Sequence, residues 1–76
     1  MFLTTIYIYL LNEGTDVWRP VEAERLADNR YRIVTPNGDP EDEHWQFLTG
    51  TVVRCEWRTL SESPQLIAVE SLEAAV

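Results

Sequence analysis

The sequence predicts an all-β protein, a small five-stranded, strongly bent antiparallel barrel. Short runs rich in β-branched and aromatic residues recur along the chain, and turn-forming residues separate most of them. No long stretch shows the periodicity of an amphipathic helix. The expected strands cover residues 4–11, 17–26, 30–35, 51–57 and 66–69. The 76 residues suffice for one domain, which we expect at residues 1–70, followed by a short C-terminal tail at 71–76.

The first expected strand is apolar on both faces. Its two faces carry Ile6, Ile8 and Leu10, and Tyr7, Tyr9 and Leu11. Such a strand is either covered on both sides or exposes its tyrosines. The segment is too short to cross a membrane, and no positive residue precedes it and no small-residue cleavage site follows it, so we do not expect a signal peptide.

The second strand contains Pro20, which cannot donate a hydrogen bond to a neighbouring strand. We therefore expect Pro20 at an edge or a bulge, with a bend of the strand near it. The preceding turn holds Gly14, which is free to adopt a positive φ.

The register between the second and third strands follows from charge. A two-residue turn would place Arg25 opposite Arg32, which is unfavourable. A three-residue turn at residues 27–29 places Glu24 opposite Arg32 instead. It also puts Asn29 at the left-handed position of a type I turn with a bulge, which asparagine tolerates. We predict the three-residue turn.

Residues 36–50 form a long loop, because two prolines and a glycine within its first five residues end the third strand. Long loops of this kind often carry binding surfaces. Trp45 and Phe47 are spaced to point the same way, and we expect one or both to close an end of the barrel. Gly50 then precedes the fourth strand.

The fourth strand alternates clearly between apolar and polar residues. Val53, Cys55 and Trp57 share one face, so we expect all three in the core, together with Tyr31 of the third strand. Residues 61–64 form a turn, and the last strand should place Ile67 and Val69 in the core.

The composition narrows the range of partners and cofactors. The net charge is −7, with 13 acidic residues, six basic residues and no lysine. An acidic surface repels phosphate, so we expect neither a nucleic-acid nor a membrane partner. The lack of lysine excludes a P-loop and a Schiff-base lysine. Cys55 is the single cysteine, which excludes an intrachain disulfide and favours the cytoplasm.

The candidates for catalysis centre on His44, the only histidine. It follows four carboxylates, those of Asp39, Glu41, Asp42 and Glu43. Their spacing does not match the calcium-binding loop, and adjacent residues of an extended loop point in different directions. A thiol buried in a strand face is not activated as a nucleophile. We therefore predict no enzyme and no cofactor. An enzyme that uses His44 and these carboxylates, metal-dependent or hydrolytic, remains as an alternative.

The aromatic residues are more informative. The candidates for an exposed binding patch are Tyr7, Tyr9, Trp18 and Trp45. Ring faces attract cations and pack against proline. Acidic neighbours, among them Asp16, Asp42 and Glu43, would favour a cationic ligand.

Two stretches of the chain resemble motifs of a group of short, uncharacterised bacterial proteins. Residues 14–23 read GTDVWRPVEA and match G-x-D-V-W-R-P-V-x-A, and residues 45–55 read WQFLTGTVVRC and match W-x-F-x-x-G-x-V-V-R-C. The resemblance covers residues 4–58 and implies no activity. A looser likeness to SH3-like and Tudor-like barrels rests on short, bent strands joined by one long loop. It implies the fold, but the ligand-site positions of those barrels cannot be matched one by one.

Together these observations predict a cytoplasmic, non-enzymatic module that binds another protein. The predicted ligand surface comprises the aromatic residues and the acidic rim of the long loop. Pairing of two copies through an open strand edge is a further alternative.

Overall fold

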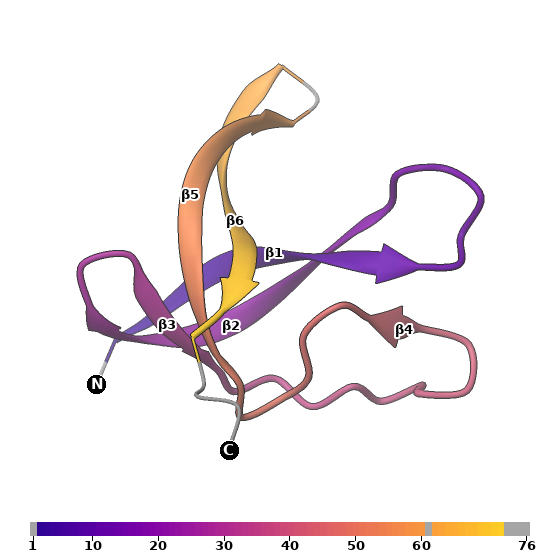
Figure 1. Cartoon of the computed structure of the whole chain (residues 1–76), viewed down its shortest axis with the longest axis horizontal. Helices are drawn as coiled ribbons and strands as arrows, with labels where there is room; N and C mark the ends of the chain where they lie inside the picture. The colour runs from indigo at the N-terminus through magenta and orange to yellow at the C-terminus, as the bar shows by residue number, and fades with distance from the viewer. Residues whose placement is uncertain (1, 61, 73–76) are drawn as a thin grey trace.

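The computed structural model describes residues 2–60 and 62–72 (Figure 1). These residues form strands and turns, and none of them belongs to a helix that could span a membrane. The strands are β1 (Leu3–Leu11), β2 (Trp18–Ala27), β3 (Arg30–Ile33), β4 (His44–Trp45), β5 (Val52–Leu60) and β6 (Ser63–Ser71).

Five of the strands close into a ring, so the predicted five-stranded barrel is confirmed. The pairs β1–β2, β2–β3, β3–β5 and β5–β6 are antiparallel, and β6 returns to β1. The closing pair is parallel and consists of Tyr7 opposite Ile67. Its direction follows from the topology, because the first and last strands of a meander with an odd number of strands run the same way. The two-residue strand β4 adds to the far end of β1.

The predicted register of the β2–β3 hairpin is confirmed. Glu24 lies opposite Arg32, and the register shifts between Arg25 and Ala27, where the bulge was expected. Asn29 has a φ of 65°. The guanidinium of Arg32 donates to the Glu24 carboxylate at 3.3 Å. The turn that places Glu24 opposite Arg32 is therefore the one that the chain forms.

Pro20 lies at an open edge, as predicted. The N–H of Leu10 donates to the carbonyl of Val17, so the odd-numbered residues of β2 direct their backbone groups toward β1. The nitrogen of Pro20 points to the opposite edge. On that edge β3 begins its pairing only at Ala23, so no hydrogen bond of the sheet is lost there.

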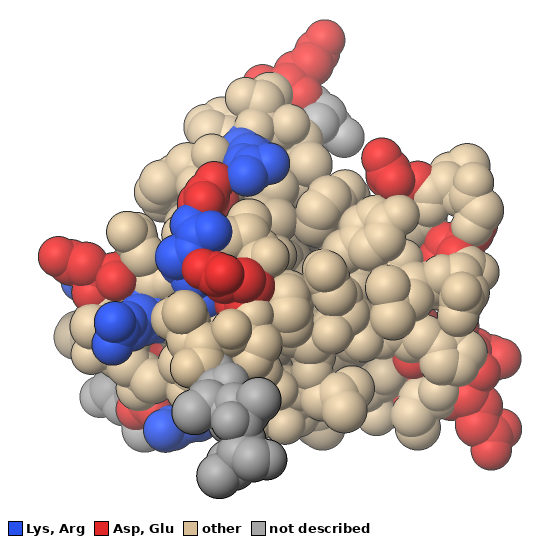
Figure 2. Space-filling view, in the orientation of Figure 1, with Lys and Arg blue, Asp and Glu red and all other residues tan. Residues whose placement is uncertain are grey.

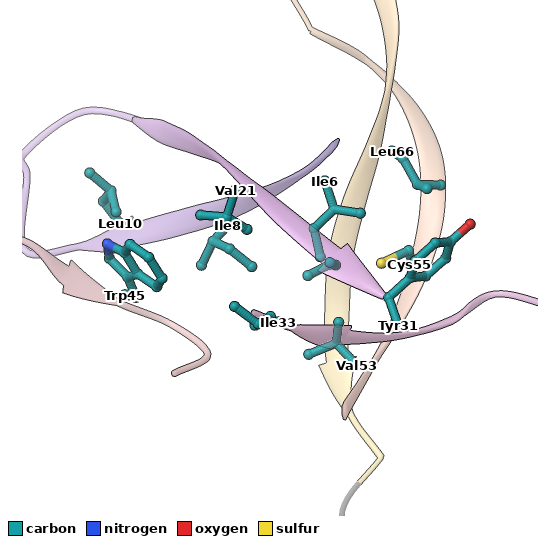
Figure 3. Packing of buried hydrophobic residues seen from close by; sticks show 12 residues of the cluster. Ile6, Ile8, Leu10, Val21, Tyr31, Ile33, Trp45, Val53, Cys55 and Leu66 are labelled. Atoms are coloured by element: carbon teal, nitrogen blue, oxygen red, sulfur yellow. The ribbon is translucent and has the colours of Figure 1, made fainter. Parts of the chain in front are cut away.

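The core is one continuous cluster inside the barrel (Figure 3). The predicted core positions Tyr31, Val53 and Cys55 are buried in it. Trp45 and Leu10 lie at one end of the cluster, and Leu66 and Tyr31 lie at the other. The full cluster is Ile6, Ile8, Leu10, Val21, Ala23, Tyr31, Ile33, Trp45, Val53, Cys55, Leu66 and Ala68.

The prediction that Trp57 belongs to the core is wrong, because 69% of this residue is exposed. The alternation of side chains between the two faces of β5 continues past Cys55, but β3 does not extend along this part of β5. β3 pairs only with Val52, Val53 and Arg54, so the outer halves of β5 and β6 leave the barrel as a two-stranded ribbon (Figure 1). Trp57 still points to the inner side of the ribbon, where none of the described segments buries it.

The last strand also differs from its prediction. β6 begins at Ser63 rather than after a turn at 61–64, and Pro64 pairs with Thr59. The register shift between Arg54 and Cys55 leaves Val69 as an extra residue, so Val69 is only half-buried while Ile67 is buried as predicted.

The first two residues of the predicted tail adjoin the sheet. Ser71 ends β6, and the N–H of Leu72 donates to the carbonyl of Val52. The remainder of the predicted tail lies outside the described residues.

Candidate ligand-binding groove

Two hollows of about 350 and 360 Å³ adjoin on one side of the barrel. They share Asp16 and Trp18, and we call them together the aromatic groove. The groove lies between the end of the β1–β2 hairpin and the projecting β5–β6 ribbon, the two lobes at the right and top of Figure 2. The residues that line it most closely are Tyr7, Tyr9, Asp16, Val17, Trp18, Gln46, Arg58, Leu60, Gln65, Ile67, Ala68 and Val69.

One wall of the groove is aromatic, and the pairing of β1 with β2 creates it. Tyr9 lies opposite Trp18 in a pair that exchanges no backbone hydrogen bonds, where side chains approach most closely. The two rings meet edge to face, with centroids 5.1 Å apart and planes at 68°. Tyr7 lies two residues before Tyr9 on the same face of β1. The tyrosines therefore occupy the outer face, which is one of the two outcomes expected from the sequence.

A carboxylate completes this wall. The hydroxyl of Tyr9 donates to Asp16 Oδ1 at 3.0 Å. This hydrogen bond and the negative charge of Asp16 raise the pKa of Tyr9, so the phenol stays a donor at neutral pH. Among the described residues, Asp16 forms no ion pair with an arginine. Its negative charge therefore remains available at the groove.

The opposite wall comes from β5 and β6. Leu60, Gln65, Ile67 and Val69 supply a largely apolar surface, and Arg58 is the one cation that lines the groove among the described residues. Arg58 donates to Glu56 Oε1 at 2.8 Å, so its charge is already balanced.

Arg58 belongs to a charge ladder of Glu70, Arg54, Glu56 and Arg58. The bonds from Arg58 and Arg54 lower the pKa of Glu56. The pKa of Arg54 is raised by its hydrogen bonds to two carboxylates, mainly that of Glu56 and next that of Glu70. Glu56 and Arg54 therefore remain charged at neutral pH.

The structure brings together three of the predicted site residues and separates the other three. Tyr7, Tyr9 and Trp18 meet in the groove. Trp45 is not part of an exposed patch, because only 6% of it is exposed and it packs in the core. With Glu43 it lines a separate hollow of about 280 Å³. The expectation that Trp45 closes an end of the barrel is confirmed, and the half-buried Phe47 packs against the same core.

Glu43 helps to hold Trp45 at the closed end of the barrel. The Arg19 guanidinium binds the Glu43 carboxylate with two donors, one of them Nε at 3.0 Å from Oε1. The indole N–H of Trp45 donates to the same oxygen at 3.1 Å. These bonds, that of Arg19 foremost, lower the pKa of Glu43. Asp42 is exposed on the same loop and does not line the groove.

The acidic run of the long loop is shaped by backbone bonds. The N–H groups of Asp42 and Glu43 both donate to the carbonyl of Asp39. The side chain of Asn37 accepts from the Asp39 N–H and donates to the Glu43 carbonyl, at 2.9 and 2.8 Å. These bonds form a tight turn within the long loop.

The residues considered for catalysis are not assembled. His44 lies exposed on β4 and lines neither hollow of the groove. In the part of the chain that the structure describes, no three His, Cys, Asp or Glu side chains are placed to hold a metal ion. Cys55 is buried, and burial raises the pKa of its thiol to about 12.

Sequence reasoning missed the second wall of the groove. Leu60 and Gln65 flank the segment that was expected to turn, and Arg58 was expected on the polar face of the fourth strand, so their place opposite Trp18 was not foreseen. A signal was present, because Thr59 and Leu60 continue the alternation of the strand up to Ser61.

No family model, no curated protein and no solved structure matches this chain. The resemblance to short bacterial proteins therefore stays a prediction.

Proposed function

We propose that the protein is a non-enzymatic, cytoplasmic module whose aromatic groove holds an extended, cationic segment of another protein. One observation carries the proposal: Tyr7, Tyr9 and Trp18 gather in one groove beside the carboxylate of Asp16, which has no arginine partner among the described residues. The acidic loop at 36–50, which the sequence suggested as part of the ligand surface, contributes only Gln46 to the lining.

The chemistry of the groove fits such a segment. A guanidinium or ammonium group can lie against an aromatic face while it pairs with a carboxylate. The apolar wall of Leu60, Ile67 and Val69 would take the intervening apolar or proline side chains. The net charge of −7 would increase the rate at which a basic partner arrives.

The alternative of an enzyme built on His44 gains no comparable support. An active site needs a concave pocket that holds the imidazole beside a carboxylate. His44 is exposed and lines neither hollow of the groove.

The test uses a synthetic peptide of alternating prolines and arginines, and a control peptide in which glutamate replaces each arginine. Isothermal titration calorimetry should show binding of the first peptide only, weakening as salt is added. Trp18→Ala and Asp16→Asn should each weaken binding about tenfold or more, since each removes a contact to the cation.

Trp57→Ala is the matched control, because it removes an exposed indole that does not line the groove. Far-ultraviolet circular dichroism establishes that each variant is folded. Equal binding of the two peptides, or binding that Trp18→Ala and Asp16→Asn leave unchanged, would contradict the proposal.

A further inference from the structure

The outer half of β5 has an open edge. On the side away from β6, β3 pairs with Val52–Arg54, and the N–H of Cys55 donates to the carbonyl of Asn29 at 2.9 Å. Alternate residues of a strand direct their backbone groups to the same edge. The N–H and C=O groups of Trp57 and Thr59 therefore point to this side as well, where none of the described strands pairs with them.

The open edge also carries a large exposed aromatic side chain, because 69% of Trp57 is exposed. Proteins usually protect unpaired edges with lysine, proline, bulges or short strands. The edge of β5 instead combines unpaired backbone groups with a large apolar ring, which favours association with another strand.

The charged residues of β5 indicate which strand associates with this edge, namely β5 of a second copy of the chain. When two identical strands pair antiparallel about a two-fold axis at Trp57, Glu56 of each copy lies opposite Arg58 of the other. The two Trp57 rings then meet on the other face. A register centred on Arg58 would instead set Arg58 against itself, which is unfavourable. Only the register at Trp57 both places opposite charges across the axis, next to the Arg58–Glu56 pair within each chain, and covers the ring.

We infer that two copies of the chain pair through the outer edges of β5, with Trp57 at the two-fold axis. The β2–β3 turn at Asn29 already occupies the edge at Cys55, so the intermolecular ladder is short. A small contact of this kind gives a weak dimer that depends on concentration. Arg58 borders both this contact and the aromatic groove, whereas Tyr7, Tyr9 and Trp18 of the aromatic wall lie on β1 and β2. Each copy in the dimer therefore keeps its aromatic wall.

The register can be tested by exchanging charges. Sedimentation equilibrium of the wild-type chain over a range of concentrations should show a reversible monomer–dimer equilibrium. Glu56→Arg and Arg58→Glu, each studied alone, bring like charges together across the axis and should weaken the dimer about tenfold or more. In an equimolar mixture of the two variants both cross-strand pairs are again opposite in charge, so a heterodimer should form.

The controls are Glu22→Arg and Arg25→Glu on β2, which change the net charge by the same amounts at exposed positions. They should leave the dimer intact. Trp57→Ala is a second, independent variant that should also dissociate it, and circular dichroism establishes that each chain is folded. A wild-type chain that is monomeric at every concentration would overturn the inference, and so would a mixture of the two β5 variants that stays monomeric.

Discussion

The two ends of the barrel differ in whether they bury a tryptophan. At the end closed by the long loop, Trp45 is 6% exposed, and β4 holds it against Leu10 of β1. At the other end, on the β5–β6 ribbon, Trp57 is 69% exposed. Both residues point toward the inner side of the structure. The difference is that a loop returns across the first end, whereas the second continues as two strands without a third.

This contrast shows what alternation along a strand can and cannot predict. It gives the face on which a side chain lies, but not whether another segment covers that face. Trp45 is covered because Glu43, two residues earlier, is bound by Arg19 of β2 and so fixes the loop. Among residues 2–60 and 62–72, no equivalent contact holds a segment over Trp57.

The largest expected effect tests the closed end. Trp45→Ala should reduce the free energy of unfolding by about 3–5 kcal/mol, because it removes a buried indole and opens the core. Urea unfolding followed by circular dichroism measures the loss. Trp45→Phe, which keeps an aromatic ring but not the bond to Glu43, should lose less. A normal unfolding curve for Trp45→Ala would show that the loop does not close the barrel.

A smaller effect tests the pairing that holds the loop. The pKa of Glu43 is lowered in the folded chain, so its contribution to stability is present above its ordinary value of 4.5 and is lost as the pH falls through the lower, folded pKa. Glu43→Gln should therefore lower the melting temperature at pH 7, and the gap to the wild type should narrow in acid.

Glu56→Gln is the matched substitution on the ribbon. The pKa of Glu56 is also lowered, so the sign of its pH dependence is the same. Its effect should be weaker and more sensitive to salt, because the Glu56 side chain is 37% exposed and that of Glu43 is 23% exposed. Equal melting curves for Glu43→Gln and the wild type across the whole pH range would mean that the Arg19 pair does not fix the loop.

The smallest expected effect is at the open end. Trp57→Ala should change the free energy of unfolding by about 0.5 kcal/mol or less, since an exposed side chain leaves no cavity. Urea unfolding of the dilute chain, where the inferred dimer is dissociated, gives this value. A loss of several kcal/mol would place Trp57 in packing that the structure does not show.

The sequence sufficed for those parts of the fold that depend on near neighbours. The opposition of Arg25 and Arg32 excluded one turn, and the alternative places Asn29 in the left-handed conformation that the structure contains. Burial of Cys55 followed from alternation alone. Both results depend on contacts within one hairpin or one strand.

Only one wall of the candidate site was predictable, because only that wall is formed by strands that are adjacent in the sequence. Tyr7, Tyr9 and Trp18 belong to adjacent strands, so their patterns point to a shared surface. Arg58 and Gln65 reach the groove only because β5 and β6 extend beyond the barrel and face the β1–β2 hairpin. These two pairs of strands are far apart in the sequence. That placement depends on how the whole sheet bends, which no local pattern encodes.

The barrel is joined by a single residue pair, Tyr7 with Ile67, whereas each hairpin within it is held by a ladder of several residues. This seam is therefore the place where the sheet can unroll while its hairpins stay intact, and amide exchange should be faster there than in the hairpins. Both Tyr7 and Ile67 also border the aromatic groove. A ligand seated there would bridge the two ends of the rolled sheet, so occupancy and closure of the seam would reinforce each other thermodynamically.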